Sequence, residues 1–300
     1  MFKIAFSPLY QHPLPEGHRF PMEKYELIPK QLLHEGIIQE SDMFEPKLAQ
    51  TVDILNTHTH AYIEQLNNLS LDKTAIRRIG FPLSKELVER EKCLIQGTLD
   101  CAHFALQDGI SMNIAGGTHH AFADRGEGFC LFNDMAFAAN MLLIQQKVKR
   151  ILIIDLDVHQ GNGTASIFKN KPEVFTWSMH AKDNYPFHKE ESDLDIPLQS
   201  GTSDNAYISL LEEHLPKVLA IHKPEIIFYL CGVDVLASDK LGKLNLSMEA
   251  CKKRDELVFK SAQSLQIPVV CAMGGGYSPR ISDIVNAHCQ TFKVAQNIFF

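Results

Sequence analysis

The residues best suited to chemistry lie in the stretch Asp155–His159, which directly follows an apolar run. Alternate side chains of an extended segment share a face, so Asp157 and His159 can reach one ion together, with Asp155 one step further back. Zinc accepts carboxylate oxygen and imidazole nitrogen, and a catalytic zinc leaves its fourth position to water. Asp234, which follows another apolar run, is the best candidate for the third protein ligand. The pattern therefore predicts a hydrolytic zinc site.

A second polar segment contains the adjacent histidines His119 and His120. Two neighbouring histidines can share proton transfer if their surroundings push their pKa values apart. We expect Asp155 to accept a hydrogen bond from one imidazole and Asn162 to be the neutral neighbour of the other. A carboxylate raises the pKa of a histidine because it favours the cation, whereas an amide does much less.

Tyr277 follows a run of three glycines, residues 274–276, at the end of a further apolar run. A phenol carried on such a turn can be aimed into a crevice and can donate to an oxyanion as it forms. Two aspartates and a neutral histidine would cancel the charge of Zn²⁺, which weakens the metal as a Lewis acid. A neighbouring base and an extra hydrogen-bond donor would compensate for that loss.

Each motif has a simpler explanation when it is taken alone. An Asp-x-Asp-x-His segment is more often a polar loop, paired histidines commonly cap or pack, and a glycine-rich turn can serve only to reverse the chain. Their convergence on one crevice favours a functional site. We interpret His58 and His60 as structural residues of a helical pattern, and Cys130 as a packed thiol rather than a nucleophile.

The elements that must position these residues alternate between short β-rich runs and longer amphipathic stretches, which is typical of an α/β fold with a parallel sheet sandwiched by helices. The strands are predicted at Lys3–Ser7, Ser111–Ala115, Ile151–Asp155, Val174–Met179, Ile226–Cys231 and Val269–Met273. The helices are predicted at Ser84–Gln107, Asn133–Gln146, Asn205–His222, Met248–Leu265 and Ile281–Gln296. In open sheets of this type, ligands bind beyond the carboxyl ends of the strands, where every motif above falls.

Composition agrees with one catalytic domain over residues 1–300, since 45% of the residues are hydrophobic, 22% are charged, and no linker or repeat interrupts the chain. The net charge of −7 argues against a nucleic-acid partner, and no apolar run is long enough to cross a bilayer. The first residues do not resemble a signal peptide, so we expect a cytoplasmic protein. The seven cysteines contain no Cys-x-x-Cys pair and are expected to be free thiols of a reducing compartment.

The order of five segments resembles that of the zinc-dependent histone deacetylase family. These segments are Gly116–His120, Gly128–Cys130, Asp155–His159, Gly232–Asp234 and Gly274–Tyr277. A narrower similarity, to the class IV branch and its bacterial relatives, rests on His12–Met22, Ile154–Gly163, Ser238–Gly242 and Lys253–Phe259.

The resemblance implies the arginase/deacetylase fold and hydrolysis of an N-acyl amide, most often acyl-lysine of a peptide or protein, at the base of a narrow tunnel. The site residues it implies are Asp157, His159 and Asp234 for zinc; His119, His120, Tyr277, Asp155 and Asn162 for catalysis; Phe129, Gly128 and Gly275 for substrate; and Asp155, Asp157, His159, Ser178 and Met179 for a structural potassium ion. Class I members carry aspartate where Asn162 stands, so the protonation of His120 should not be copied from them.

The expected reaction is attack of activated water on the amide carbonyl, with His120 as the base, His119 alongside and Tyr277 donating to the oxyanion. The alternative assignment, with His119 as the base, stays open at this point. Three alternatives stay open: a deacetylase of small amines such as acetylpolyamines, a ureohydrolase, and a non-catalytic protein that binds acyl-lysine. A ureohydrolase would need a larger set of carboxylates to hold two metal ions. Acyl-chain length, oligomeric state and the choice between zinc and iron stay open at this point.

Overall fold

The apolar runs form the centre of one parallel sheet in the computed structural model, which describes residues 2–300. Its eight strands lie in the order β2-β1-β3-β8-β7-β4-β5-β6, and all neighbouring strands pair in parallel. The strands are β1 (Lys3–Ala5), β2 (Met43–Phe44), β3 (Ile110–Asn113), β4 (Ile151–Asp155), β5 (Val174–Ala181), β6 (Leu194–Leu198), β7 (Ile226–Leu230) and β8 (Val269–Ala272). The inner strands β3, β4, β7 and β8 are buried along their whole length, as expected for a sheet covered on both faces.

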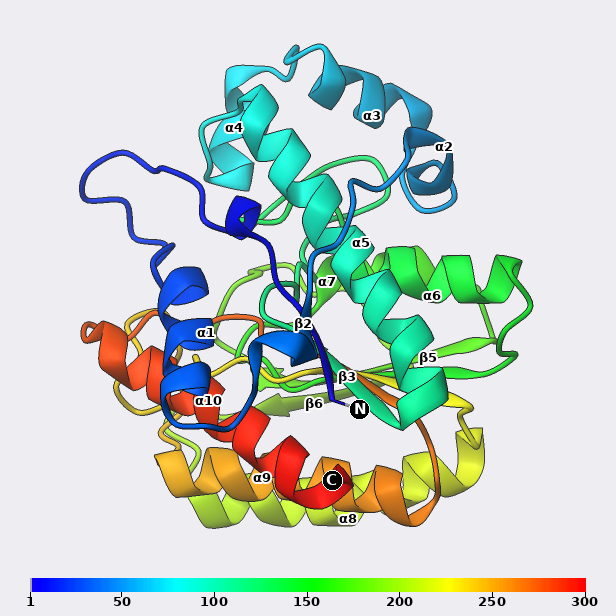
Figure 1. Cartoon of the computed structure of the whole chain (residues 1–300), viewed down its shortest axis with the longest axis vertical. Helices are drawn as coiled ribbons and strands as arrows, with labels where there is room; N and C mark the ends of the chain where they lie inside the picture. Colours follow the sequence, from blue (N-terminus) through cyan, green and yellow to red (C-terminus); the bar gives the residue numbers. More distant parts are fainter. Residues whose placement is uncertain (1) are drawn as a thin grey trace.

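Helices cover both faces of this sheet, with α5, α6 and α7 on one side and α1, α8, α9 and α10 on the other (Figure 1). The helices are α1 (Lys24–His34), α2 (Thr51–Ile54), α3 (His60–Asn67), α4 (Lys73–Ile79), α5 (Lys85–Asp108), α6 (Asp134–Ile144), α7 (Asn162–Phe168), α8 (Asp204–His222), α9 (Met248–Ser264) and α10 (Ile281–Phe299), with 3-10 turns at Pro8–Tyr10 and Glu40–Asp42. Among residues 2–300, no helix combines the length and the apolar character that crossing a membrane requires.

The parallel sheet between helical layers confirms the predicted fold class, and the predicted strands are all present, with no end shifted by more than two residues. The long helices begin where the sequence indicated, because the side chains of Ser84, Asn133 and Ser247 cap the first turns of α5, α6 and α9. Two edge strands were missed. β2 has two residues, and β6 contains Pro197, which a sheet tolerates only at an edge or a bulge.

The sheet order brings together the segments that follow β3, β4, β7 and β8. Backbone hydrogen bonds continue past the strand ends, from Leu156 N to Leu230 O at 3.0 Å and from Cys231 N to Ala272 O at 3.1 Å. Four loops distant in sequence therefore leave the same edge of the sheet side by side.

Two predictions about residues outside the site can also be compared with the structure. All seven cysteines are buried free thiols, as expected. The helical interpretation of His58 and His60 was wrong in detail, because α3 begins at His60 and His58 precedes it. His58 is nevertheless structural: it is buried, its Nδ1 lies 2.9 Å from Phe122 O, and burial lowers its pKa to about 4.

Candidate active site

Asp157, His159 and Asp234 form a cluster in which one possible ligand atom of each lies within 4.8 Å of the others. Asp157 and His159 come from the loop after β4, and Asp234 comes from the loop after β7. His159 Nδ1 lies 3.0 Å from Asp157 Oδ1 and 3.2 Å from Asp234 Oδ2. Asp234 Oδ2 is buried and accepts no hydrogen bond from residues 2–300. The donor set and this orphaned oxygen fit a divalent cation such as zinc.

The charges of the cluster indicate the same need for a cation. Burial and the neighbouring Asp157 carboxylate raise the pKa of Asp234 to about 7. Burial alone would lower the pKa of His159, but its contacts with Asp157 and Asp234 raise it to about 10. Two carboxylates that share one buried space therefore depend on a positive charge between them, and a bound metal ion would supply it.

Backbone hydrogen bonds fix the two candidate carboxylate ligands. His159 N donates to Asp157 Oδ1 at 2.9 Å, and Val158 N donates to Asp234 Oδ1 at 3.0 Å. Gly275 N donates to the second Asp157 oxygen at 2.9 Å. Each aspartate is thus oriented by the loop of another strand, which couples the loops after β4, β7 and β8.

The two histidines have unlike partners, as the sequence predicted. His119 Nδ1 lies 2.7 Å from Asp155 Oδ2, and His120 Nδ1 lies 2.7 Å from Asn162 Oδ1. A carboxylate only accepts hydrogen bonds, so His119 carries its proton on Nδ1 and presents Nε2 to the cluster, 3.9 Å from Asp157 Oδ1. The imidazole rings are 4.1 Å apart.

The same partners separate the two histidine pKa values. Burial would lower the pKa of His119, but the charges of Asp155 and Asp157 raise it above its ordinary value. Burial lowers the pKa of His120 well below its ordinary value, and the neighbouring His119 and His159 lower it further. Of the pair, His120 is therefore the one kept neutral, which is the state a general base requires.

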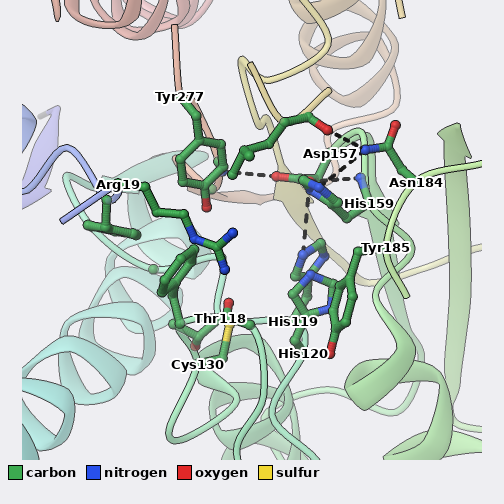
Figure 2. Close-up of a pocket in the computed structure, with 18 of the residues that line it drawn as sticks. Arg19, Thr118, His119, His120, Cys130, Asp157, His159, Asn184, Tyr185 and Tyr277 are labelled. Atoms are coloured by element: carbon green, nitrogen blue, oxygen red, sulfur yellow. Dashed lines mark hydrogen bonds and ion pairs between the residues drawn. The ribbon is translucent and has the colours of Figure 1, made fainter. Parts of the chain in front are cut away.

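Tyr277 faces the same space from the glycine turn after β8, while Asp157 and His159 lie on another wall and the histidine pair on a third (Figure 2). Its ring packs against those of Phe20 and Phe129, each with a centroid distance of 6.1 Å. Burial and the nearby carboxylates raise its pKa well above the ordinary value, so the phenol keeps its proton as a donor. Gly275 is required beside it, because a Cβ there would lie 2.0 Å from Asp234 Oδ2.

His119, His120, Asp157, His159 and Tyr277 line one cavity of about 430 Å³. Phe129, Tyr185 and Leu241 line it, as expected for Phe129, and Gly128 brings the backbone close enough that a Cβ there would meet His120 at 2.6 Å. Tyr185 was not predicted; its ring packs edge-on against His120 at 4.9 Å. The sequence gives no local signal for it.

The charged residues of the lining are mostly cationic. The cations are Arg19, Arg78, Arg90 and Lys243, and the acids are Asp157 and Asp183. Arg19 extends its guanidinium into the cavity, with Cζ 5.2 Å from the centre of the Phe129 ring (Figure 2).

The residues predicted for potassium also come together in part. Asp155 pairs with Ser178 in the register of β4 and β5, and Met179 follows on β5. Asp155, Asp157, His159, Ser178 and Met179 are all buried. Cys130 is a packed thiol as expected, since burial raises its pKa well above the ordinary value.

Three charged residues that hold the site were missed. Asp134, the first residue of α6, accepts hydrogen bonds from Thr98, Gly117 and Thr118. Asp239 accepts from Tyr277 N at 2.6 Å, and Lys24 donates to Gly274 O at 2.9 Å. The position of Asp134 at a predicted helix start was a usable signal, whereas the other two contacts depend on tertiary structure.

Comparison with known proteins agrees with this geometry. The family model described as the histone deacetylase domain matches residues 18–292. An uncharacterised protein of Picosynechococcus sp. is 40% identical over 298 residues, which is 99% of each chain. Histone deacetylase 2 of Arabidopsis thaliana is 32% identical over 272 residues, 87% of this chain and 70% of its own length.

Solved structures agree as well. An HDAC homologue complexed with SAHA has a TM-score of 0.86 at 27% identity, covering 99% of this chain and 84% of its own. The HDAC homologue from Aquifex aeolicus has a TM-score of 0.82 at 25% identity, covering 98% and 84%.

Proposed function

Because the chain belongs to the histone deacetylase family, we propose that it is a zinc-dependent hydrolase that removes acyl groups, acetyl or longer fatty acyl, from lysine side chains of peptides or proteins. The observation that carries the proposal is that Asp157 and His159, which cluster with Asp234, line one cavity together with the histidine pair and Tyr277. Binding alone would require neither a split histidine pair nor a protonated phenol.

We assign zinc to Asp157, His159 and Asp234, the donor set whose excess negative charge calls for a cation. When bound there, zinc would lower the pKa of water and polarise an amide carbonyl. A structural potassium ion is proposed near Asp155 and Ser178, and its role would be to hold the loop after β4 rather than to react.

The protein side chains supply the proton transfers in this proposal. Neutral His120 takes the proton of the attacking water, and Asn162 holds its ring through Nδ1. His119, which Asp155 keeps as the more basic of the two, stabilises the developing charge and can protonate the leaving amine. Tyr277 donates to the oxyanion, since its raised pKa keeps the phenol protonated.

The charge of the lining favours acyl-lysine over acetylpolyamine. A polyamine carries further ammonium groups, and these need carboxylate partners. The cavity offers Asp183 for that purpose, because Asp157 is engaged in the metal cluster, while Arg19, Arg78 and Lys243 would repel a second cation.

Further proposals follow from the same observations. We propose that residues 1–300 act as one catalytic domain, because the cavity draws on segments from Arg19 to Tyr277. The buried free thiols support our proposal of a reducing, cytoplasmic setting.

The test is kcat/KM of the zinc-loaded protein on one lysine peptide carrying acyl groups from acetyl to myristoyl, with acetylpolyamine alongside. Preference for long chains would identify a lysine defatty-acylase, and preference for acetyl would identify a deacetylase. Turnover of acetylpolyamine alone would refute the lysine assignment. Tight binding of acyl-lysine without turnover would refute catalysis.

A further inference from the structure

Lys24 is a buried cation that the proposed mechanism does not use. It is the first residue of α1, its side chain is 0% exposed, and its Nζ donates to Gly274 O at 2.9 Å. The two residues are 250 positions apart in the sequence. Gly274 begins the turn that carries Tyr277, so the contact joins the N-terminal segment directly to the proposed oxyanion donor.

This lysine is held without a carboxylate partner. Among residues 2–300, no acid lies within ion-pair distance of its Nζ, and the rings of Phe20 and Tyr25 face it at 5.3 Å each. Removing an ammonium from water is costly, and two aromatic faces with one carbonyl compensate only in part. A residue that served only to fill this space would be more stable as an apolar side chain, so the retained charge points to a role at Gly274.

The peptide group that accepts from Lys24 also donates to the metal cluster. The carbonyl of Gly274 and the N–H of Gly275 belong to one peptide plane, and Gly275 N donates to Asp157 Oδ2 at 2.9 Å. A cation on the carbonyl polarises the peptide and strengthens the hydrogen bond that its N–H donates. Lys24 is thus linked to Asp157 through a single peptide unit.

The turn is fixed at its other end by a second loop. Tyr277 N donates to Asp239 Oδ2 at 2.6 Å, and Gly274 has a φ of +70°, which favours glycine. With Asp239 holding the end and Lys24 holding the beginning, the orientation of the whole turn depends on both contacts.

We propose that Lys24 is a positioning residue that acts through the Gly274–Gly275 peptide to aim Tyr277 and to hold Asp157. This inference rests on the proposed hydrolase function. Loss of the contact leaves the tyrosine chemically intact but free to tilt away from the oxyanion, and a displacement of about 1 Å can reduce a rate by roughly 100-fold.

The test is a double-mutant cycle on kcat with the zinc-loaded enzyme. Lys24→Met keeps the length and volume and removes the donor; it should lower kcat by about 10- to 100-fold while KM changes by less than about threefold. In the Tyr277→Phe background the same change should cost less than about threefold, because the hydroxyl it aims is gone. Equal losses in both backgrounds would overturn the role in aiming Tyr277.

Lys30→Met is the matched control, since it removes an exposed lysine from the same helix and should leave kcat unchanged. Lys24→Gln retains an uncharged hydrogen-bond donor and should recover part of the rate lost in Lys24→Met. If Lys24→Met fails to fold, Lys24→Gln takes its place in the kinetic test. A folded Lys24→Met enzyme with kcat within twofold of wild type would refute the proposal.

A zinc titration against a competing chelator gives a readout without turnover. Lys24→Met should bind zinc more weakly than wild type by about three- to tenfold, because Asp157 loses part of its orientation. If the wild-type protein hydrolyses no acyl-lysine peptide, the proposed hydrolase function is refuted. The zinc titration then tests by itself whether Lys24 holds Asp157. Equal zinc affinity of the two proteins would overturn the role of Lys24 at Asp157.

Discussion

Replacing Asn162 by aspartate tests the division of labour between the histidines with almost no change of shape. His120 Nδ1 lies 2.7 Å from Asn162 Oδ1, the same distance that separates His119 from Asp155. Asn162→Asp therefore gives His120 the environment that its neighbour already has. Both histidines are buried, but the charges of Asp155 and Asp157 raise the pKa of His119, whereas the pKa of His120, whose Nδ1 faces only an amide, is lowered by burial and by the neighbouring His119 and His159.

The direction and size of the effect follow from this comparison. An adjacent carboxylate raises the pKa of a group that becomes cationic by about 1–3 units. A base must be neutral, so the acid limb of the kcat/KM profile should move to higher pH by that amount. At pH values below the acid limbs of both wild type and Asn162→Asp, kcat/KM of the variant should be lower than that of wild type by about 10- to 1000-fold. On the alkaline plateau, the two values should agree within a few-fold.

The assay is the pH dependence of kcat/KM on an acyl-lysine peptide at equal zinc loading, because a zinc ion at the proposed site would lower the pKa values of both histidines in every variant. Asp155→Asn is the reciprocal change and lowers the pKa of His119 instead. An acid limb that stays in place for Asn162→Asp but moves to lower pH for Asp155→Asn would refute the assignment of His120 as the base.

Three further outcomes are expected. Tyr277→Phe should lower kcat by about 100- to 1000-fold at unchanged zinc content and melting temperature, because its hydroxyl makes no hydrogen bond to residues 2–300; full activity would exclude the oxyanion role. Asp157→Ala should lose zinc by elemental analysis while wild type retains it, and stoichiometric zinc in the variant would refute the ligand assignment. Asp134→Ala should lower the free energy of unfolding in urea by roughly 3–5 kcal/mol, since it leaves the part-buried N–H of Gly117 and the buried N–H of Thr118 unpaired; a loss below about 1 kcal/mol would contradict this.

The parts of the site that the sequence predicted are those tied to strand ends. Asp157, His159 and Asp234 lie within four residues of the ends of the buried strands β4 and β7, so their position at the carboxyl edge follows from the parallel sheet. The pairing of the histidines with Asp155 and Asn162 was also predictable, because the partner types lie in the adjacent loop.

The parts of the site that were missed depend on residues in environments that are unusual for their type, namely a proline inside a helix and a fully buried lysine. Pro29 interrupts the helical pattern of α1, so the helix that carries Lys24 was not predicted. Lysine is almost never fully buried, and its contact with Gly274 spans most of the chain. Neither periodicity nor local spacing contains that information.

Arg254 is another buried charged residue whose contacts the sequence does not predict, and it holds the loops after β4 and β7. It lies on α9, where its polar character predicts an exposed position, yet it is 0% exposed. Its Nη1 donates to Gly232 O at 2.7 Å and to Leu156 O at 3.4 Å, and its Nη2 donates to Cys231 O at 3.2 Å.

One guanidinium therefore joins the backbone of the loop after β4 to that of the loop after β7, the two loops that supply the candidate metal ligands. Asp255 balances its charge through a hydrogen bond of 2.9 Å from Arg254 Nε, so the buried cation is paired as well as hydrogen-bonded. A lysine at this position could reach one carbonyl but could not span both loops in a fixed plane. Arg254 thus helps to fix the distance between Asp157 and Asp234, although it contacts neither side chain. For this reason the candidate ligands can be identified from the sequence, whereas their relative positions cannot.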